Sequence, residues 1–234
     1  MYMKICINLI LLCRAGLFSA VLLVVSCSSD APEQAAEDPV QEIPSLTSVP
    51  AVQSDASGNP TSPVDGARII NANSEPGNWL SHGRTYDEQR YSPLAQINDS
   101  NVSELGMAWF YDLDTNRGQE STPLVVDGVM YVTTAWSMIK ALNAATGELI
   151  WSYDPQVPRE RGVFACCDVV NRGAAIWGDR VYLGTLDGRL VALDASSGEV
   201  EWEVQTVDLD KPYTITGAPR VVNGKVIIGN GGAE

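Results

Sequence analysis

The chain has 234 residues, a formal net charge of −14 and a hydrophobic fraction of 45%, which allows a globular protein with a sizeable core. This acidic balance argues against nucleic acid as a partner, because phosphate backbones repel an acidic protein. The single histidine, His82, argues against a Ser-His-Asp triad and a multi-histidine metal site, and the absence of a Cys-x-x-Cys-His motif excludes covalent c-type haem.

Residues 1–27 have the features of an export signal. Lys4 and Arg14 come before or at the start of an apolar run from Ala15 to Val25, which is short for a membrane span. The run ends in Val24-Val25-Ser26-Cys27, which resembles a bacterial lipoprotein box. The alternative is an ordinary signal peptide with a chance cysteine.

The resemblance to lipoproteins implies that Cys27 is lipidated and becomes the mature N-terminus. Ser28 follows it in place of aspartate, which by the sorting rule for such proteins favours the outer membrane. Residues 28–65 are rich in Pro, Ser, Ala, Asp and Glu without apolar periodicity, so they predict a disordered tether. We expect the folded domain to occupy residues 66–234.

A repeat runs through this folded part. Residues 123–151 and 174–202 are similar, and a third copy opens at 218–232. Each full copy predicts a hairpin with a Gly-containing turn, a third strand, and a fourth strand that ends in Trp151 or Trp202. Four short strands in about 50 residues are typical of a β-propeller blade. The motif A-L-x-A-x-[TS]-G-E-x-x-W resembles the tryptophan-docking repeat of quinoprotein propellers.

The predicted fold is therefore all-β: the first two to three blades of a propeller that we expect to have eight. Gly147 and Gly198 allow tight turns, and each tryptophan can bury a large area between adjacent blades. A β-sandwich with two similar hairpins, or another propeller family, is the alternative. Because propellers close with about 4–8 blades, we expect the chain to be an N-terminal fragment of a longer protein.

Two cysteines are adjacent at Cys166 and Cys167, in A-C-C-D-V-V-N-R-G. If Cys6 and Cys13 leave with the signal and Cys27 carries lipid, these two have only each other as partners in an oxidising compartment. A disulfide between neighbours closes a strained ring, and such strain tends to cluster at functional sites. The alternative is a pair of reduced core cysteines.

Together with the repeat, this stretch is similar to the pyrroloquinoline quinone (PQQ)-dependent alcohol dehydrogenases, the methanol and ethanol dehydrogenase group. The resemblance implies that Cys166 and Cys167 form a vicinal disulfide over one face of the quinone. It also implies cofactor contacts from Glu120 in R-G-Q-E-S-T-P-L, Arg172 in N-R-G and Thr216 in T-I-T-G-A-P. Quinoprotein sugar dehydrogenases share the fold but generally lack the cysteine pair, so an alcohol substrate is favoured.

The last residues, Gly-Asn-Gly-Gly-Ala-Glu at 229–234, match a further motif of this family. The resemblance implies that Gly231, Gly232 and Ala233 line the cofactor cavity and that Glu234 binds calcium or, in one branch, a lanthanide. A hard cation prefers such carboxylate oxygens. Methanol-type members often have a serine where Gly231 stands, so the glycine favours the ethanol type.

The function implied by the resemblance is that of a periplasmic quinoprotein that oxidises small primary alcohols to aldehydes by hydride transfer to PQQ and passes electrons to a cytochrome c. We expect its general base to lie beyond Glu234, so no catalytic residue is assigned. The alternative is a non-enzymatic lipoprotein propeller that serves as a scaffold in outer-membrane protein assembly. His82 lies in a segment that resembles the family's lead-in to the first blade, where we expect a structural residue with satisfied hydrogen bonds.

Overall fold

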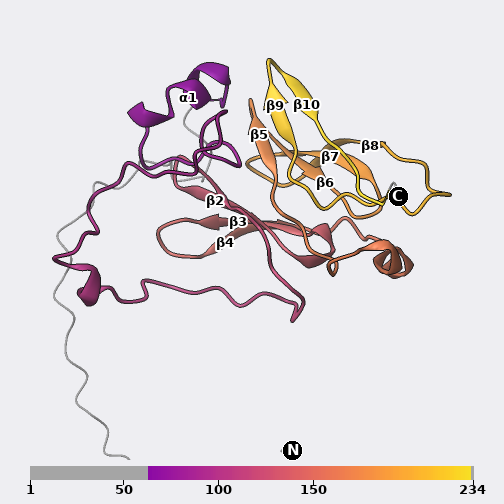
Figure 1. Cartoon of the computed structure of the whole chain (residues 1–234), viewed down its shortest axis with the longest axis horizontal. Helices are drawn as coiled ribbons and strands as arrows, with labels where there is room; N and C mark the ends of the chain where they lie inside the picture. The colour runs from indigo at the N-terminus through magenta and orange to yellow at the C-terminus, as the bar shows by residue number, and fades with distance from the viewer. Residues whose placement is uncertain (1–62, 233–234) are drawn as a thin grey trace, which may run out of the picture. The chain divides into compact units, whose positions relative to one another are not determined.

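A computed structural model describes residues 63–232 (Figure 1). The export signal 1–27, the lipidation site Cys27, most of the 28–65 tether, Ala233 and Glu234 lie outside the described residues. Within 63–232, no helix has both the length and the apolar character needed to cross a membrane.

The sheets of the fold are two four-stranded antiparallel sheets and a hairpin (Figure 1). The first sheet is formed in sequence order by β1 (Leu124–Val126), β2 (Val129–Thr133), β3 (Ile139–Asn143) and β4 (Leu149–Tyr153). The second is formed in the same way by β5 (Ala175–Trp177), β6 (Arg180–Gly184), β7 (Arg189–Asp194) and β8 (Val200–Gln205). The hairpin is β9 (Arg220–Val222) with β10 (Lys225–Ile227). This confirms the all-β prediction, with two complete blades and the first half of a third.

The blade hairpins close at the predicted turn residues. Asp127 and Gly128 both have positive φ angles, 50° and 86°, as do Asn223 and Gly224, at 50° and 70°. Two consecutive residues with positive φ are typical of the type I′ turn, whose twist suits a two-residue hairpin. The Asp-Gly and Asn-Gly pairs thus set the register of the first two strands in the first and third blades.

Short helices lie outside the sheets: α1 (Gly66–Ile70), η1 (Ala72–Ser74), η2 (Val102–Glu104), η3 (Ala135–Ser137) and η4 (Arg159–Phe164). The carboxylate of Asp65 caps α1 by accepting a hydrogen bond from the backbone N–H of Arg68, at 2.9 Å. Val64 is fully buried and exchanges two backbone hydrogen bonds with Gly178. Val64 and Asp65 thus already contact the folded part, two residues before the expected start of the domain at residue 66.

Strand β7 of the second blade is buried on both faces. Val191 and Leu193 of β7 pack into the core shared with the first blade, whereas Leu190 and Ala192 pack with Val221 of β9. Alternation along a strand sends successive side chains to opposite faces. The four consecutive apolar residues 190–193 of β7 are therefore explained by sheets stacked on both sides of the strand, which is how propeller blades are arranged.

Trp151 at the end of the first blade docks on a turn of the second. Its indole Nε1 donates a hydrogen bond to the carbonyl of Ala195, at 3.0 Å, and the hydroxyl of Tyr131 donates to the same carbonyl, at 3.1 Å. The ring covers Gly198, where a Cβ atom would lie 2.6 Å from Cε3 of the indole. The glycine of the repeat motif is thus required by the tryptophan of the preceding blade.

The same docking occurs one step earlier in the chain. Trp109 donates to the carbonyl of Ala144, at 3.2 Å, and a Cβ atom at Gly147 would lie 2.5 Å from its Cε3. In contrast, Trp202 is 39% exposed, compared with 7% for Trp151. The described residues contain only the first two strands of the third repeat, so they do not include a turn that would receive Trp202.

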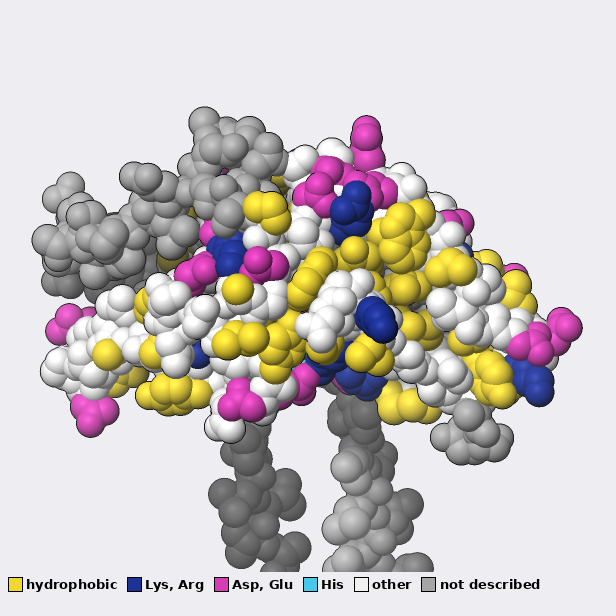
Figure 2. Space-filling view, turned by 90° about the horizontal axis from the view of Figure 1, so that it is seen from above, with side chains coloured by type: hydrophobic (Ala, Val, Ile, Leu, Met, Phe, Trp, Pro, Cys, Tyr) yellow, Lys and Arg dark blue, Asp and Glu magenta, His cyan; other side chains and the backbone are white. Residues whose placement is uncertain are grey.

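Apolar side chains also remain at the surface. All six residues of β8 are exposed, including Val200 and Val204. Figure 2 shows hydrophobic side chains gathered over the middle of one face, with acidic side chains mostly toward its periphery. Val200, Trp202 and Val204 alternate with polar residues along β8, so one face of this strand offers an apolar row of the kind on which a further blade packs.

Replacing Gly198 with alanine should destabilise the complete protein by about 2–3 kcal/mol, because the new methyl group meets the Trp151 indole and the residue has a φ of +73°. Gly178→Ala is the matched control, since Gly178 has a φ of +67° but no atom within 4 Å of the position that the alanine methyl group would take. The control should cost about 1 kcal/mol from backbone strain alone. Urea unfolding of both variants measures the difference, and equal losses would show that the indole contact contributes nothing.

Candidate cofactor site

Three segments meet at one end of the blades, each just before the first strand of its own blade. They are residues 117–122 before β1, 166–173 before β5 and 214–218 before β9. Backbone hydrogen bonds join neighbouring segments, from Thr122 N–H to the Arg172 carbonyl at 3.1 Å and from Arg172 N–H to the Thr216 carbonyl at 2.9 Å. Residues far apart in the sequence therefore lie side by side.

Arg172 is the centre of this site. Its Nη2 lies 2.8 Å from a carboxylate oxygen of Glu120, and its Nη1 donates a hydrogen bond to the Thr216 hydroxyl at 2.6 Å. The structure thus brings together three residues for which the family resemblance implied cofactor contacts. The side chains of Arg172 and Glu120 are 38% and 42% exposed, so the guanidinium has further N–H groups available to a ligand.

The residues on either side of Arg172 fix its backbone. Asn171 is buried, donates to the Gly184 carbonyl at 2.8 Å and accepts from the N–H of Gly173 at 3.0 Å. Gly173 has a φ of 138°, and a Cβ atom there would lie 3.1 Å from the carbonyl oxygen of Thr122. Sequence reasoning did not single out Asn171, although the N-R-G motif already contained it.

Cys166 and Cys167 lie at the edge of the site. Both side chains are exposed, so the alternative that they are buried in the core is wrong. Their sulfur atoms are 2.7 Å apart as two free thiols, so the vicinal disulfide stays a prediction. The pKa of the Cys167 thiol is raised, first by its hydrogen bond and charge interaction with Cys166 and also by the charge of Glu120, whereas the charge of Arg172 acts in the opposite direction.

The glycine-rich end of the chain is tied to the same site. Gly231 and Thr214 exchange two backbone hydrogen bonds, of 2.8 and 3.2 Å. Gly232 has a φ of 78°, and a Cβ atom there would lie 2.2 Å from the carbonyl oxygen of Pro212. The backbone therefore requires glycine at 232 whether or not a cofactor is bound.

The predicted metal ligand Glu234 and the cavity residue Ala233 lie outside the described residues. Among residues 63–232, no three His, Cys, Asp or Glu side chains are grouped closely enough to hold a metal ion. The metal site therefore stays a prediction based on Glu234.

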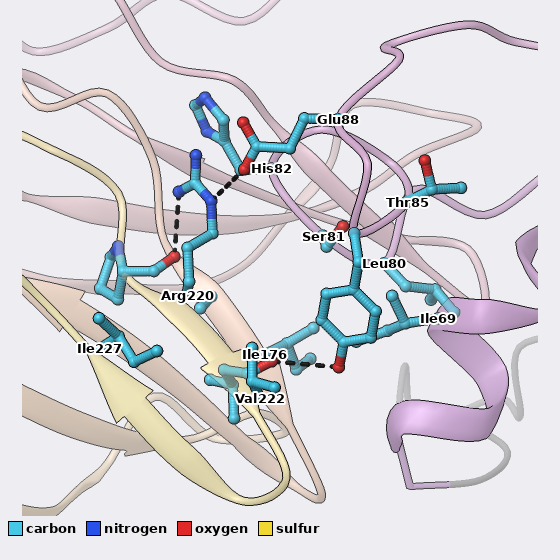
Figure 3. A pocket seen from close by; sticks show the side chains of 14 residues that line it. Ile69, Leu80, Ser81, His82, Thr85, Glu88, Ile176, Arg220, Val222 and Ile227 are labelled. Atoms are coloured by element: carbon cyan, nitrogen blue, oxygen red, sulfur yellow. Dashed lines mark hydrogen bonds and ion pairs between the residues drawn. The ribbon is translucent and has the colours of Figure 1, made fainter.

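An open hollow of about 490 Å³ adjoins Arg172 and is also lined by His82, Arg220 and Gly229. A second hollow, of about 250 Å³, lies between the segment around His82 and strand β9 (Figure 3). Figure 3 shows Arg220 paired with Glu88 at the edge of this second hollow. His82 and Arg220 line both hollows.

His82 is held only on one side. Its Nε2 lies 3.1 Å from Nη1 of Arg90, and Nη2 of the same arginine donates to the Thr122 hydroxyl at 2.7 Å. Its Nδ1 is buried and has no hydrogen-bond partner within residues 63–232. The expectation of a fully satisfied histidine is therefore wrong. Burial lowers the pKa of His82, and the positive charges of Arg220 and Arg90 lower it further, which favours the neutral ring.

In the reduced protein, Cys167 should be alkylated more slowly at neutral pH than an unperturbed thiol. A raised pKa leaves less thiolate below that pKa, so the rate should rise only at higher pH. Cys166→Ala removes the largest cause of the shift, so the rate profile of Cys167 should move to lower pH. Iodoacetamide rates measured by mass spectrometry across the pH range test this, and coincident profiles of the two proteins would refute it.

Comparison with known proteins gives a family for this arrangement. The model of the glucose/ethanol/alcohol dehydrogenase β-propeller domain matches residues 79–233. The quinohemoprotein alcohol dehydrogenase ADH-IIG of Pseudomonas putida is 61% identical over 191 residues, which cover 81% of this chain and 26% of that protein. The 1-butanol dehydrogenase (cytochrome c) of Thauera butanivorans is 60% identical over 159 residues, which cover 68% of this chain and 23% of that protein. The chain thus spans about a quarter of the length of these curated relatives.

Solved structures agree with the described fold. The structure of ADHIIG from Pseudomonas putida HK5 matches with a TM-score of 0.73 and 64% identity, covering 75% of this chain and 26% of that chain. A europium-containing methanol dehydrogenase matches with a TM-score of 0.67 and 41% identity, covering 71% of this chain and 29% of that chain. The family match includes both complete blades and Glu120, Arg172 and Thr216, and the chain therefore belongs to the PQQ-dependent alcohol dehydrogenase family, as a part of its β-propeller domain.

Proposed function

We propose that this chain is part of a periplasmic dehydrogenase that oxidises small primary alcohols to aldehydes with PQQ as hydride acceptor and transfers the electrons to a cytochrome c. The observation that carries the proposal is the convergence of Glu120, Arg172 and Thr216 beside the exposed Cys166 and Cys167. The names of the relatives support it, since one is a quinohemoprotein alcohol dehydrogenase and another a 1-butanol dehydrogenase (cytochrome c).

The side chains at this site fit a quinone that carries carbonyl and carboxylate oxygens. Arg172 is partly exposed and has N–H groups beyond those used by Glu120 and Thr216, so it can donate to adjacent oxygens of a planar ligand. Its positive charge would stabilise negative charge that develops on those oxygens. When bound, PQQ would supply the two-electron acceptor for the reaction.

The paired cysteines are suited to cover one face of such a ligand. Both sulfur atoms are exposed and polarizable, and a bond between them would leave few rotatable angles. A rigid covering loses little entropy when the cofactor binds. We therefore retain the vicinal disulfide as part of the proposal, with Gly231, Gly232 and Ala233 as the neighbouring parts of the cavity.

Glu234 is proposed as a ligand of a calcium or lanthanide ion next to the cofactor. Its carboxylate is the donor that such hard cations prefer. The europium-containing methanol dehydrogenase matched above supports a metal in this family. Glycine at 231 supports the ethanol type of substrate, and the general base is proposed to lie beyond residue 234.

The complete protein that contains this chain should bind PQQ and, with calcium, catalyse ethanol-dependent reduction of a cytochrome c. Arg172→Lys should raise the dissociation constant for PQQ at least about tenfold, because lysine cannot replace the bidentate fork. Arg180→Lys is the matched control, since Arg180 is a similarly exposed arginine paired with Glu201 on the second blade. PQQ binding is measured by equilibrium dialysis. A wild-type protein that binds no PQQ would support the scaffold alternative instead.

Lipid anchoring at Cys27 is proposed to hold the protein at the outer membrane. Cys27→Ser should release the protein from the membrane fraction into the soluble periplasmic fraction, because the substituted residue cannot carry the lipid. Fractionation followed by mass spectrometry of the N-terminal peptide measures both location and lipid. An unmodified wild-type Cys27 would favour the ordinary signal peptide.

A further inference from the structure

We propose that Asp168 is a positioning residue, which clamps the turn of Cys166 and Cys167 to the segment that carries Glu120 and so holds the two sulfur atoms at the cofactor. The inference rests on the proposed function of this site. Asp168 directly follows the cysteine pair, and the family resemblance assigned it no role.

The Asp168 carboxylate uses both of its oxygens to reach the neighbouring segment. Oδ1 lies 2.7 Å from Nη2 of Arg117, and Oδ2 accepts a hydrogen bond from the backbone N–H of Gly118 at 3.2 Å. One contact is to a side chain and the other to the backbone. The carboxylate therefore holds the 117–120 segment in position as well as the arginine at its start.

A second ion pair, between Arg172 and Glu120, joins the same two segments with the cation and the anion exchanged between them. The segment from Arg117 to Glu120 carries a cation followed by an anion, and the segment from Asp168 to Arg172 carries an anion followed by a cation. Attraction requires that each cation face the anion of the other segment. Sliding either segment would separate both pairs, so together they fix how the cysteine turn lies against Glu120.

The backbone at Asp168 is suited to this role. Its φ is 69°, in the left-handed region where aspartate and asparagine are the most tolerated residues after glycine. Backbone N–H groups of Val169 and Gly118 lower the pKa of its carboxyl, and the charge of Arg117 lowers it further. The carboxylate is therefore charged at neutral pH, and the clamp would be lost only on acidification through this lowered pKa.

The cysteines depend on such a clamp because burial does not hold them. Both are exposed, and Cys166 pairs with Asp168 through a backbone bridge within the same turn. An exposed turn gains its order from a few polar contacts rather than from packing. Loss of the Asp168 contacts with Arg117 and Gly118 should therefore allow the two sulfur atoms to move relative to the rest of the site.

Asp168→Asn tests the clamp in the complete protein, because asparagine keeps the shape and tolerates the positive φ while removing the charge. We expect the dissociation constant for PQQ to rise about fivefold, the effect of losing one partly exposed ion pair. Glu201→Gln is the matched control, since it removes a pair of similar exposure, 29% and 39% compared with 33% and 49%, on the second blade. The control should leave PQQ binding unchanged.

A second measurement separates positioning from a general loss of stability. Hydrogen exchange of the peptide that contains Cys166 and Cys167, in the protein without cofactor, should become faster in Asp168→Asn and not in Glu201→Gln. The melting temperatures of the two variants should be alike. Arg117→Gln should resemble Asp168→Asn, and the double variant should be no worse than either single one, because all three lack the same pair.

The outcomes distinguish this inference from the proposed function. Wild-type protein that binds no PQQ would overturn both. Wild-type protein that binds PQQ, with Asp168→Asn binding equally tightly, would overturn the positioning role alone. Additive effects of the Asp168 and Arg117 substitutions would also overturn it, since the two residues would then act independently.

Discussion

The contact of the Trp151 indole with the Gly198 turn is the constraint on which the rest of the fold depends. It joins the last strand of one blade to a turn of the next through a buried ring and a hydrogen bond to the Ala195 carbonyl. Hydrophobic burial supplies most of the attraction, whereas the hydrogen bond fixes the orientation of the ring. Because Gly198 has no side chain, the Trp151 indole packs directly against the backbone of the turn. This contact fixes the distance between the two blades.

That spacing decides where the functional residues meet. Each blade brings one segment to the site, just before its first strand, and blades stacked side by side place these segments next to one another. Arg172 can therefore contact Glu120 from the first blade and Thr216 from the third at the same time. A change in blade packing would separate these side chains without altering any of them. The packing of the core thus determines the distances between the site residues.

Charge is organised within the site although the whole chain is strongly acidic. The chain has a net charge of −14, whereas Arg172 and Arg117 at the site are each matched to one carboxylate. Arg172 paired with Glu120 is held in place before any ligand arrives, which lowers the entropy lost on binding. The second pair, Arg117 with Asp168, applies the same principle to the cysteine turn. Partly exposed pairs are individually weak, so their value lies in orientation more than in stability.

The sequence by itself determined the local structure and the family: alternating apolar residues, Asp-Gly and Asn-Gly turns and a tryptophan repeat act over short distances, so they specify blades before any contact is known. The tertiary structure alone decided which distant groups meet. Composition placed Val64 in a tether, yet its backbone pairs with Gly178. Asp168 stands in the cysteine motif, but the motif shows neither its contact with Arg117 nor the one-sided hydrogen bonding of His82. The physical reason is that these contacts join residues far apart in the sequence. Whether such residues come within hydrogen-bonding distance depends on how the whole chain packs, and local sequence patterns do not specify this.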